Sequence, residues 1–186
     1  MSRKHPMGNE HQTDNAELNE LLKEARRLTP PEFAEAHREL FLLVQRSTLH
    51  NHAQFETDVP TGRGSALPPA LSSTEVSVVP IRKSLRSPYQ DRISIGRARS
   101  CDVVIRDTSI SKLQAYVFTG EDGSHAIVDV GSQNGTKIGS HRLVPQKPMP
   151  LKAGNILTLG AVVATTLDAT SAQRALLRLH EGSFCR

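Results

Sequence analysis

Short segments in which apolar and polar residues alternate fill the chain from residue 74 to residue 168. A clear example is the run 75–82, in which Val76 and Val78 alternate with polar neighbours ahead of Pro80. Alternation with a period of two is typical of half-buried β-strands, and many short strands separated by turns are typical of a β-sandwich. Because proline lacks a backbone N–H, Pro80 indicates an edge position or an irregular strand. We therefore expect a mainly-β fold of two packed sheets over residues 74–168.

Turn-forming residues set the ends of these segments. The Glu121-Asp122-Gly123 sequence predicts a hairpin turn between two of the strands. The order of the segments fits two sheets whose polar loops gather at one end. The predicted strands cover residues 75–82, 92–96, 103–105, 114–118, 126–130, 137–138, 142–144, 156–159 and 162–167.

The pattern before the predicted sandwich is helical instead. Asp14 is placed to cap a helix over residues 15–27, on which apolar residues recur on one face. The sequence Thr29-Pro30-Pro31-Glu32 has the pattern of a capping box with prolines in the first turn, and it opens a second helix expected to run to about Arg46. The two segments predict an α-helical hairpin over residues 14–48.

The second predicted helix carries a wide apolar face, because Phe41, Leu42 and Leu43 follow one another. A hairpin of two helices cannot cover a face of this width by itself. Three ways of covering it stay open: packing against the chain's own sandwich, a homodimer through the N-terminal helices, or another protein.

Three further segments flank these units. Residues 1–13 are polar without periodicity and predict a disordered tail, and residues 49–73 are rich in Pro, Gly, Ser and Thr and predict a flexible linker. A helical pattern returns in residues 169–186, where Thr170 or Ser171 is placed to cap a short helix ahead of the tail. The apolar face of this helix packs on the edge of the sandwich or binds a partner.

The composition offers little support for metal or cofactor chemistry. The two cysteines, Cys101 and Cys185, lie far apart, which argues against a disulfide framework or a metal site and favours a reducing compartment. His37, His50 and His52 lack the spacing of a zinc-binding helix, so we expect solvated surface histidines. No apolar run approaches the roughly eighteen residues of a membrane span, and no secretory pattern is present. We therefore expect no cofactor, no metal, no membrane contact and a cytoplasmic protein.

Basic residues concentrate in one part of the chain. The formal net charge is +4 with a pI of about 9.3, and residues 82–112 hold eight Lys and Arg against three Asp and Glu. Such a field attracts a phosphopeptide as readily as a nucleic acid. Nucleic-acid binding is not favoured, since helix-turn-helix and zinc-finger patterns are missing and aromatic residues are few. Motifs of hydrolases, metalloproteases and kinases are missing too, so we do not expect an enzyme.

Two polar clusters hold the candidate chemistry. The first contains Gly96-Arg97, at the end of a predicted strand, and Ser111-Lys112 in a later loop. The second is the turn-rich sequence Asp129-Val130-Gly131-Ser132-Gln133-Asn134-Gly135-Thr136. A guanidinium, a hydroxyl and an ammonium on turns, with an Asn-Gly turn beside them, are suited to holding a phosphate group and the peptide next to it.

In their order and spacing these motifs resemble the forkhead-associated (FHA) domain, a β-sandwich that binds phosphothreonine peptides, over roughly residues 75–167. The resemblance implies that Arg97 pairs with the phosphate, that Ser111 donates its hydroxyl to it, and that Lys112 adds charge or a hydrogen bond. It also implies that Asn134 holds the peptide backbone. The positions that would support the site are Gly96, Gln114, Ser132, Gly135 and Thr136.

Two positions depart from the family pattern. Gln114 stands where the family usually has a histidine that braces the binding loops, and Gly139-Ser140 stands where it often has Asn-Gly. The alternative that Gln114 favours is a degenerate scaffold that binds partners, or itself, independently of phosphate.

The resemblance also implies a partner. It implies an adaptor in protein kinase-dependent signalling whose partner is a threonine-phosphorylated protein, either a Ser/Thr kinase or a kinase substrate. Residues 137–142 would read the positions that follow the phosphothreonine.

Overall fold

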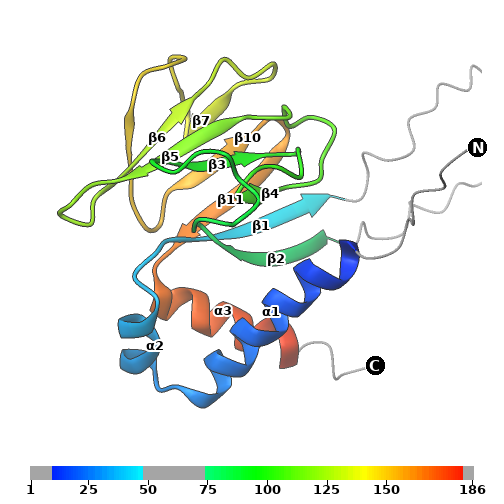
Figure 1. The fold of residues 1–186 in the computed structure, drawn as a ribbon, viewed down its shortest axis with the longest axis vertical. Helices are drawn as coiled ribbons and strands as arrows, with labels where there is room; N and C mark the ends of the chain where they lie inside the picture. The colour runs from blue at the N-terminus through cyan, green and yellow to red at the C-terminus, as the bar shows by residue number, and fades with distance from the viewer. Residues whose placement is uncertain (1–9, 48–73, 182–186) are drawn as a thin grey trace, which may run out of the picture.

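The computed structural model describes residues 10–47 and 74–181. Two sheets pack face to face, and three helices lie on the outer side of one of them (Figure 1). The predicted linker and the first nine residues of the predicted tail lie outside the described residues. No helix in the described ranges is long and apolar enough to cross a membrane.

The predicted two-sheet sandwich is confirmed, and each predicted strand is present with ends shifted by a few residues. The helices are α1 (Glu10–Arg27), α2 (Pro30–Ala36) and α3 (Ala169–Glu181). The six-stranded sheet has the order β2 (Thr74–Pro80), β1 (Phe41–Ser47), β11 (Val162–Leu167), β10 (Ile156–Leu159), β7 (Thr136–Ile138) and β8 (His141–Arg142). The five-stranded sheet has the order β4 (Val103–Val104), β3 (Ile93–Gly96), β5 (Ala115–Thr119), β6 (His125–Asp129) and β9 (Met149–Leu151). The paired strands are antiparallel except β3 and β4.

Two edge strands show how proline is accommodated. β2 lies at the edge of its sheet and pairs with β1, which agrees with the edge position that Pro80 indicates. β9 lies at the edge of the other sheet, and it was not predicted because Pro150 occupies the middle of a three-residue strand. The predicted hairpin turn at residues 121–123 is confirmed by a 3.0 Å hydrogen bond from the Gly123 N–H to the Gly120 carbonyl oxygen.

Aliphatic side chains from both sheets form the core between them. Ile95 and Ile127 enter it from the five-stranded sheet, Leu157 and Leu159 enter it from the six-stranded sheet, and all four are fully buried. Burying a side chain of this kind stabilises a fold by roughly 1.5–3 kcal/mol. The core therefore fixes the ends of β3 and β6, from which the polar loops extend.

The second half of the predicted helical hairpin is wrong. α2 ends at Ala36, and Phe41–Ser47 form β1 between β2 and β11. Leu42 and Val44 enter the core between the sheets, whereas Phe41 packs against the helices. A strand that is covered on both faces shows a continuous apolar run, which periodicity alone does not distinguish from a helix. Phe41 and Leu42 of the apolar run that suggested a homodimer are therefore covered within the chain.

The three helices form a layer on the outer face of the six-stranded sheet. Gln173 of α3, only 3% exposed, donates from Nε2 to the carbonyl oxygens of Ala25 at 2.9 Å and Leu28 at 2.8 Å. Carbonyl groups at the end of a helix have no donor within the helix, so Gln173 of α3 supplies the hydrogen-bond donor for the end of α1. α3 packs on its own chain, but on the other helices and the outer face of the six-stranded sheet and not on the edge of the sandwich as predicted. The buried residues of this layer are Leu21, Ala25, Phe33, Phe41, Val78, Ala169, Ala172 and Leu176.

The helix starts differ from the predicted ones. α1 begins at Glu10, so Asp14 lies inside the helix and residues 10–13 are not part of a disordered tail. The backbone N–H of Ser171 donates to Oδ1 of Asp168 at 2.7 Å. Asp168 is therefore the cap of α3, in place of Thr170 or Ser171.

His37 is buried, contrary to the prediction of a solvated surface histidine. It is 7% exposed, and its Nε2 and Nδ1 atoms lie 3.1 Å from Oε2 of Glu24 and 3.3 Å from Oε1 of Glu39. His37 thus links α1 to the segment between α2 and β1. His50 and His52 lie outside the described residues.

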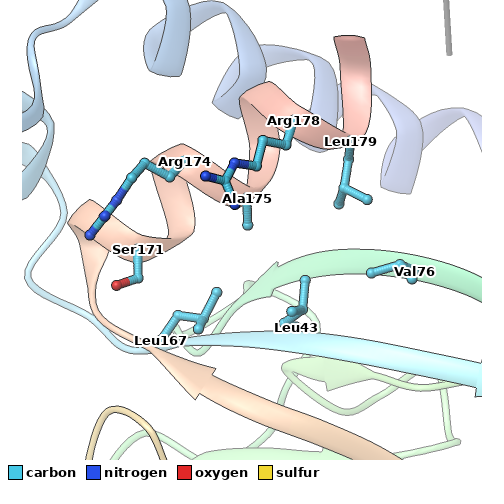
Figure 2. A pocket seen from close by; sticks show the side chains of 8 residues that line it. All are labelled: Leu43, Val76, Leu167, Ser171, Arg174, Ala175, Arg178 and Leu179. Carbon is cyan, nitrogen blue, oxygen red and sulfur yellow. The ribbon is translucent and has the colours of Figure 1, made fainter. Parts of the chain in front are cut away.

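α3 does not close completely onto the sheet. A groove of about 400 Å³ lies between α3 and the strands β1, β2 and β11 (Figure 2). Leu43, Val76 and Leu167 line it from the sheet, and Ala175 and Leu179 line it from α3. The helix layer therefore leaves part of the outer sheet face open.

Candidate functional site

The candidate site lies where three loops meet at one end of the sandwich. One loop follows β3, the second joins β4 to β5, and the third joins β6 to β7. The Arg97 N–H donates to the Ser111 carbonyl oxygen at 3.0 Å, and the Ala98 N–H donates to the Lys112 carbonyl oxygen at 3.0 Å. The structure therefore brings Arg97, Ser111 and Lys112 side by side.

Gly96 at the end of β3 allows the first two loops to approach each other. A β-carbon at this position would lie 2.3 Å from the carbonyl oxygen of Lys112 and 3.0 Å from Sγ of Cys101. Real β-carbon contacts are longer than this, so only a hydrogen atom fits. Gly96 thus sets the distance between the strand that leads to Arg97 and the loop that carries Ser111.

Ser111 connects the second loop to the third. Its Oγ accepts the backbone N–H of Gln133 at 3.0 Å. A hydroxyl that accepts a hydrogen bond keeps its own hydrogen to donate elsewhere. Ser111 is therefore oriented by the protein and still able to donate to an anion.

Asn134 makes a second link between these loops. Its Nδ2 donates to the Ser109 carbonyl oxygen at 2.7 Å, which leaves the Oδ1 atom as an acceptor. Ser109 is itself fixed, because its Oγ donates to Oδ1 of Asp107 at 2.6 Å and accepts the Ala161 N–H at 2.9 Å. The second loop is therefore tied both to Asn134 and to the turn between β10 and β11.

Gln114 is completely buried and braces the loops from below. Its Oε1 accepts the Ser111 N–H at 2.9 Å. Its Nε2 lies within donating distance of Ser132 Oγ at 2.8 Å, the Gly135 carbonyl oxygen at 2.9 Å and Thr136 Oγ1 at 3.0 Å. One side chain thus joins the loop of Ser111 to the loop of Asn134. This is the bracing position in which the resemblance places a histidine, and the glutamine occupies it with partners for both ends of its amide.

Asp129, 1% exposed, completes the support, although no supporting role was predicted for it within the second polar cluster. Its Oδ1 accepts the N–H groups of Gly131 at 2.8 Å and Ser132 at 2.9 Å, and its Oδ2 accepts the hydroxyls of Ser132 and Thr136, each at 2.6 Å. Burial raises the pKa of Asp129, but these hydrogen bonds outweigh burial and lower the pKa below its ordinary value. An aspartate shortly before a Gly-Ser pair is typical of such a turn, and the sequence Asp129-Val130-Gly131-Ser132 was the available signal.

The side chains expected to touch a ligand are accessible, whereas those expected to support the site are mostly buried. Such a division holds the contacting groups in place before a ligand arrives, which lowers the entropy cost of binding. Arg97, Lys112 and Asn134 are exposed and Ser111 is half-buried, while Gly96, Gln114, Asp129, Gly135 and Thr136 are buried and Ser132 is half-buried.

A second buried carboxylate, Asp102, holds the base of the loop that follows β3. It accepts the N–H and Oγ–H of Ser94 at 2.8 Å and 2.7 Å and the N–H of Ser84 at 2.7 Å. Nζ of Lys83 lies 2.9 Å from its Oδ1. Burial raises the pKa of Asp102, but these partners together lower it from 3.8 to about 2.

The free energy of unfolding is expected to fall in acid because of Asp102. A carboxyl whose pKa is lower in the folded protein stabilises the fold above its ordinary pKa of 3.8, and this contribution is lost as the pH falls towards about 2. The shift corresponds to about 2 kcal/mol. Urea unfolding of the wild type and of Asp102→Asn, measured from neutral pH down to about pH 2, should give a steeper acid decline for the wild type. Equal pH slopes would contradict this role of Asp102.

Comparison with known proteins finds a family match for the central part of the sandwich. Residues 93–160 match the family model of the FHA domain. A curated relative from Arabidopsis thaliana, the protein phosphatase 1 regulatory inhibitor subunit PPP1R8 homolog, is 33% identical over 79 residues. That alignment covers 38% of this chain and 21% of the relative, so the chain spans about a fifth of the length of that protein.

Solved structures of FHA domains match this chain at low sequence identity. The FHA domain of the CT664 protein from Chlamydia trachomatis is 20% identical, with 70% of this chain and 97% of that chain covered and a TM-score of 0.45. The FHA domain of an Arabidopsis thaliana hypothetical protein is 18% identical, with 71% and 86% covered and a TM-score of 0.47. The N-terminal FHA domain of Rad53p from S. cerevisiae, solved with a phosphothreonine peptide, is 14% identical, with 74% and 98% covered and a TM-score of 0.45.

The match to the family model spans all the residues expected to contact a ligand, from Arg97 to Asn134. It also spans the Gly96-Arg97, Ser111-Lys112 and Asn134-Gly135-Thr136 motifs in the order that the resemblance requires. The chain therefore contains an FHA domain, and the family model places it at residues 93–160.

Proposed function

We propose that this chain binds phosphothreonine peptides at the three-loop end of its FHA domain and acts as a non-catalytic adaptor in protein kinase-dependent signalling. The observation that carries the proposal is the state of Ser111. Its hydroxyl oxygen accepts the Gln133 N–H at 3.0 Å beside the exposed Arg97 and Lys112. A fixed hydroxyl donor next to two cationic residues is suited to a phosphate dianion.

Each contacting residue has a separate role in the proposed complex. The Arg97 guanidinium makes charge-assisted hydrogen bonds to two phosphate oxygens, because its planar fork of donors matches that geometry. The Ser111 hydroxyl and the Lys112 ammonium donate to the remaining oxygen. Asn134, held by Ser109, binds the peptide backbone next to the phosphothreonine.

The buried polar residues make this arrangement rigid before the peptide binds. Gln114 and Asp129 fix the loops of Ser111 and Asn134 through hydrogen bonds that lie below the surface. Binding then needs little ordering of the protein, so more of the interaction energy appears as affinity. The alternative of a degenerate scaffold was based on Gln114 in place of the usual histidine. Because Gln114 makes hydrogen bonds to both loops, its presence no longer favours that alternative.

The partner that we propose is a threonine-phosphorylated protein, either a Ser/Thr kinase or a substrate of one. Phosphorylation would control the interaction directly, because the phosphate supplies the charge that Arg97 and Lys112 bind.

Fluorescence-polarisation binding tests the proposal with a randomised phosphothreonine peptide pool and the same pool without phosphate. We expect binding of the phosphorylated pool alone. Arg97→Ala should weaken it about ten- to a hundredfold, since a charged hydrogen bond contributes roughly 1.5–3 kcal/mol. Arg178→Ala, which removes an exposed arginine on α3, should leave binding unchanged. Equal affinity for both pools would overturn the proposal and would favour the alternative of a scaffold that binds partners independently of phosphate.

A further inference from the structure

The outer face of the six-stranded sheet carries apolar side chains beyond the groove beside α3. Leu43 and Leu167 line the groove and pack against the buried residues of the helix layer, so their side chains mark the outer face. Val163 and Thr165 lie four and two positions before Leu167 on β11, so they point to the same face. Ile156 of β10 is the direct partner of Thr165 and shares that face. The apolar surface therefore continues from the groove across β11 to β10.

Several of these side chains are open to solvent. Ile156 is 52% exposed and Val163 is 38% exposed, and Leu179 of α3, also 38% exposed, points from the helix toward the sheet (Figure 2). They are three of the seven large apolar side chains that are exposed in the described part of the chain. Exposed apolar residues are normally scattered singly, and a group of them on one face marks an interaction surface. We call this surface the outer patch, and it consists of Leu43, Val76, Ile156, Val163, Leu167 and Leu179.

Two arginines line the same groove without an acidic partner. Arg174 and Arg178 are exposed and lie about one turn apart on α3. In residues 10–47 and 74–181 neither arginine makes an ion pair, and none of the described residues that line the groove is acidic. The pKa of Asp168 is lowered mainly by hydrogen bonds from Ser171, and the charge of Arg174 adds less. Both guanidinium groups are therefore available to carboxylates of a partner.

From this arrangement we infer that the outer patch binds an acidic amphipathic helix of a partner protein. The groove is lined by residues 171–179 and so follows α3 for about two turns. α3 packs on β1, β2 and β11, and a second helix beside it would cover the open face over β11 and β10. Apolar side chains spaced at i, i+3, i+4 and i+7 would meet the patch, and carboxylates would meet Arg174 and Arg178.

The two parts of the surface have separate roles in such a complex. The apolar patch provides the buried area, and the two arginines favour an acidic helix over a basic one. None of the outer-patch residues belongs to the three loops of the candidate site. The inference therefore goes beyond phosphopeptide binding, and a partner could occupy both surfaces at once.

A phage-displayed library of amphipathic helices tests the inference on the full chain. Each helix has a fixed apolar face, and its polar positions are randomised among Glu, Lys and Ser. We expect selection on the wild type to enrich Glu over Lys. Enriched helices are then made as labelled peptides for fluorescence polarisation. Replacing their Glu residues by Lys should weaken binding roughly tenfold, and the difference should shrink as salt is added.

Variants assign the binding to the outer patch. Val163→Glu places a negative charge in the patch and should weaken binding of the enriched helices at least tenfold. Met149→Glu is the matched control, because Met149 is also 38% exposed but lies on β9 of the other sheet. The Arg174→Gln, Arg178→Gln double variant should lose about three- to tenfold in affinity and should no longer prefer Glu to Lys helices. Thermal unfolding checks that each variant remains folded.

The inference fails if no helix is enriched, or if Val163→Glu binds the enriched helices as tightly as the wild type. Enrichment without a preference for Glu also overturns it, because the arginines would then not select the partner. Two other occupants of the patch would overturn it too. Dimers in sedimentation velocity that Val163→Glu abolishes would assign the patch to a second copy of the chain. A tenfold gain in helix affinity on Phe184→Ser would assign it to residues 182–186.

Discussion

Gln114→Glu is expected to destabilise the protein by roughly 3 to 5 kcal/mol at neutral pH and to abolish phosphopeptide binding. The substitution keeps the size of the side chain but replaces an amide that donates by a carboxylate that only accepts. Gln114 is fully buried, and its Nε2 faces Ser132 Oγ, the Gly135 carbonyl oxygen and Thr136 Oγ1. A carboxylate oxygen in place of Nε2 would be a buried negative charge that faces the Gly135 carbonyl oxygen, which cannot donate a hydrogen bond.

The surrounding hydroxyls cannot compensate by turning round. Ser132 Oγ and Thr136 Oγ1 both donate to Oδ2 of Asp129, at 2.6 Å each. If the two hydroxyls donated to a glutamate at position 114 instead, the buried Asp129 would lose both of its hydroxyl donors. The energetic cost of an unsatisfied buried carboxylate would then fall on Asp129. The Gly135 carbonyl oxygen has no hydrogen to offer.

Urea unfolding and fluorescence polarisation measure the two effects of Gln114→Glu. Gln133→Glu is the matched control, since it introduces the same charge at an exposed glutamine in the neighbouring loop. Its free energy of unfolding should change by no more than about 0.5 kcal/mol. A Gln114→Glu protein as stable as this control would show that the buried amide does not brace the loops.

The positions that gather at the candidate site were predictable because each belongs to a short motif at the end of a strand. Gly96-Arg97 ends β3 and Asn134-Gly135 leads into β7, so the strand pattern alone placed both at loop ends. The alternation of apolar and polar residues was also sufficient for most strands, because one face of each meets the core and the other meets solvent. The short polar motifs and the alternation of apolar and polar residues both depend on neighbouring residues alone, and such local features can be identified in a sequence.

The supporting interactions were less predictable, because they depend on which loops meet in space. Gln114 was noted as a departure from the family pattern, yet its four hydrogen-bond partners come from residues 111, 132, 135 and 136. Asp129 looks like an ordinary turn residue until the Thr136 hydroxyl is placed beside it. A buried side chain therefore acquires its role from the fold, and sequence spacing does not contain that information.

β1 shows the same limit for secondary structure. Phe41 and Leu42 face opposite sides of the strand, and each is fully buried, one by the helix layer and the other by the core. The period of two disappears when both faces are covered, and the run then fits a helix equally well. The helix layer that covers the outer face of the sheet is thus the cause of the error, and it could be located only after β1 had been placed.

Gly96→Ala is expected to destabilise the protein by about 3 kcal/mol and to weaken phosphopeptide binding at least tenfold. The added β-carbon would lie 2.3 Å from the Lys112 carbonyl oxygen and 2.9 Å from its carbonyl carbon. These are backbone atoms, so the collision is not relieved by a side-chain rotation. The loop must move away from β3, which stretches the 3.0 Å hydrogen bonds from Arg97 and Ala98 to Ser111 and Lys112. Arg97 and Ser111 would then no longer reach the same phosphate.

Gly123→Ala separates this collision from the general effect of replacing a glycine. Gly123 has a φ of +77° and no atom within 4 Å of the added β-carbon, so its substitution brings backbone strain of roughly 1 kcal/mol without a clash. It also lies in the β5–β6 turn, at the end of these strands away from the candidate site. In urea unfolding, the free energy of unfolding of Gly96→Ala should therefore be well below that of Gly123→Ala. Only Gly96→Ala should weaken peptide binding. Equal stability and equal peptide affinity of the two variants would contradict the proposal that the close approach of the Lys112 carbonyl group to Gly96 holds Arg97 beside Ser111.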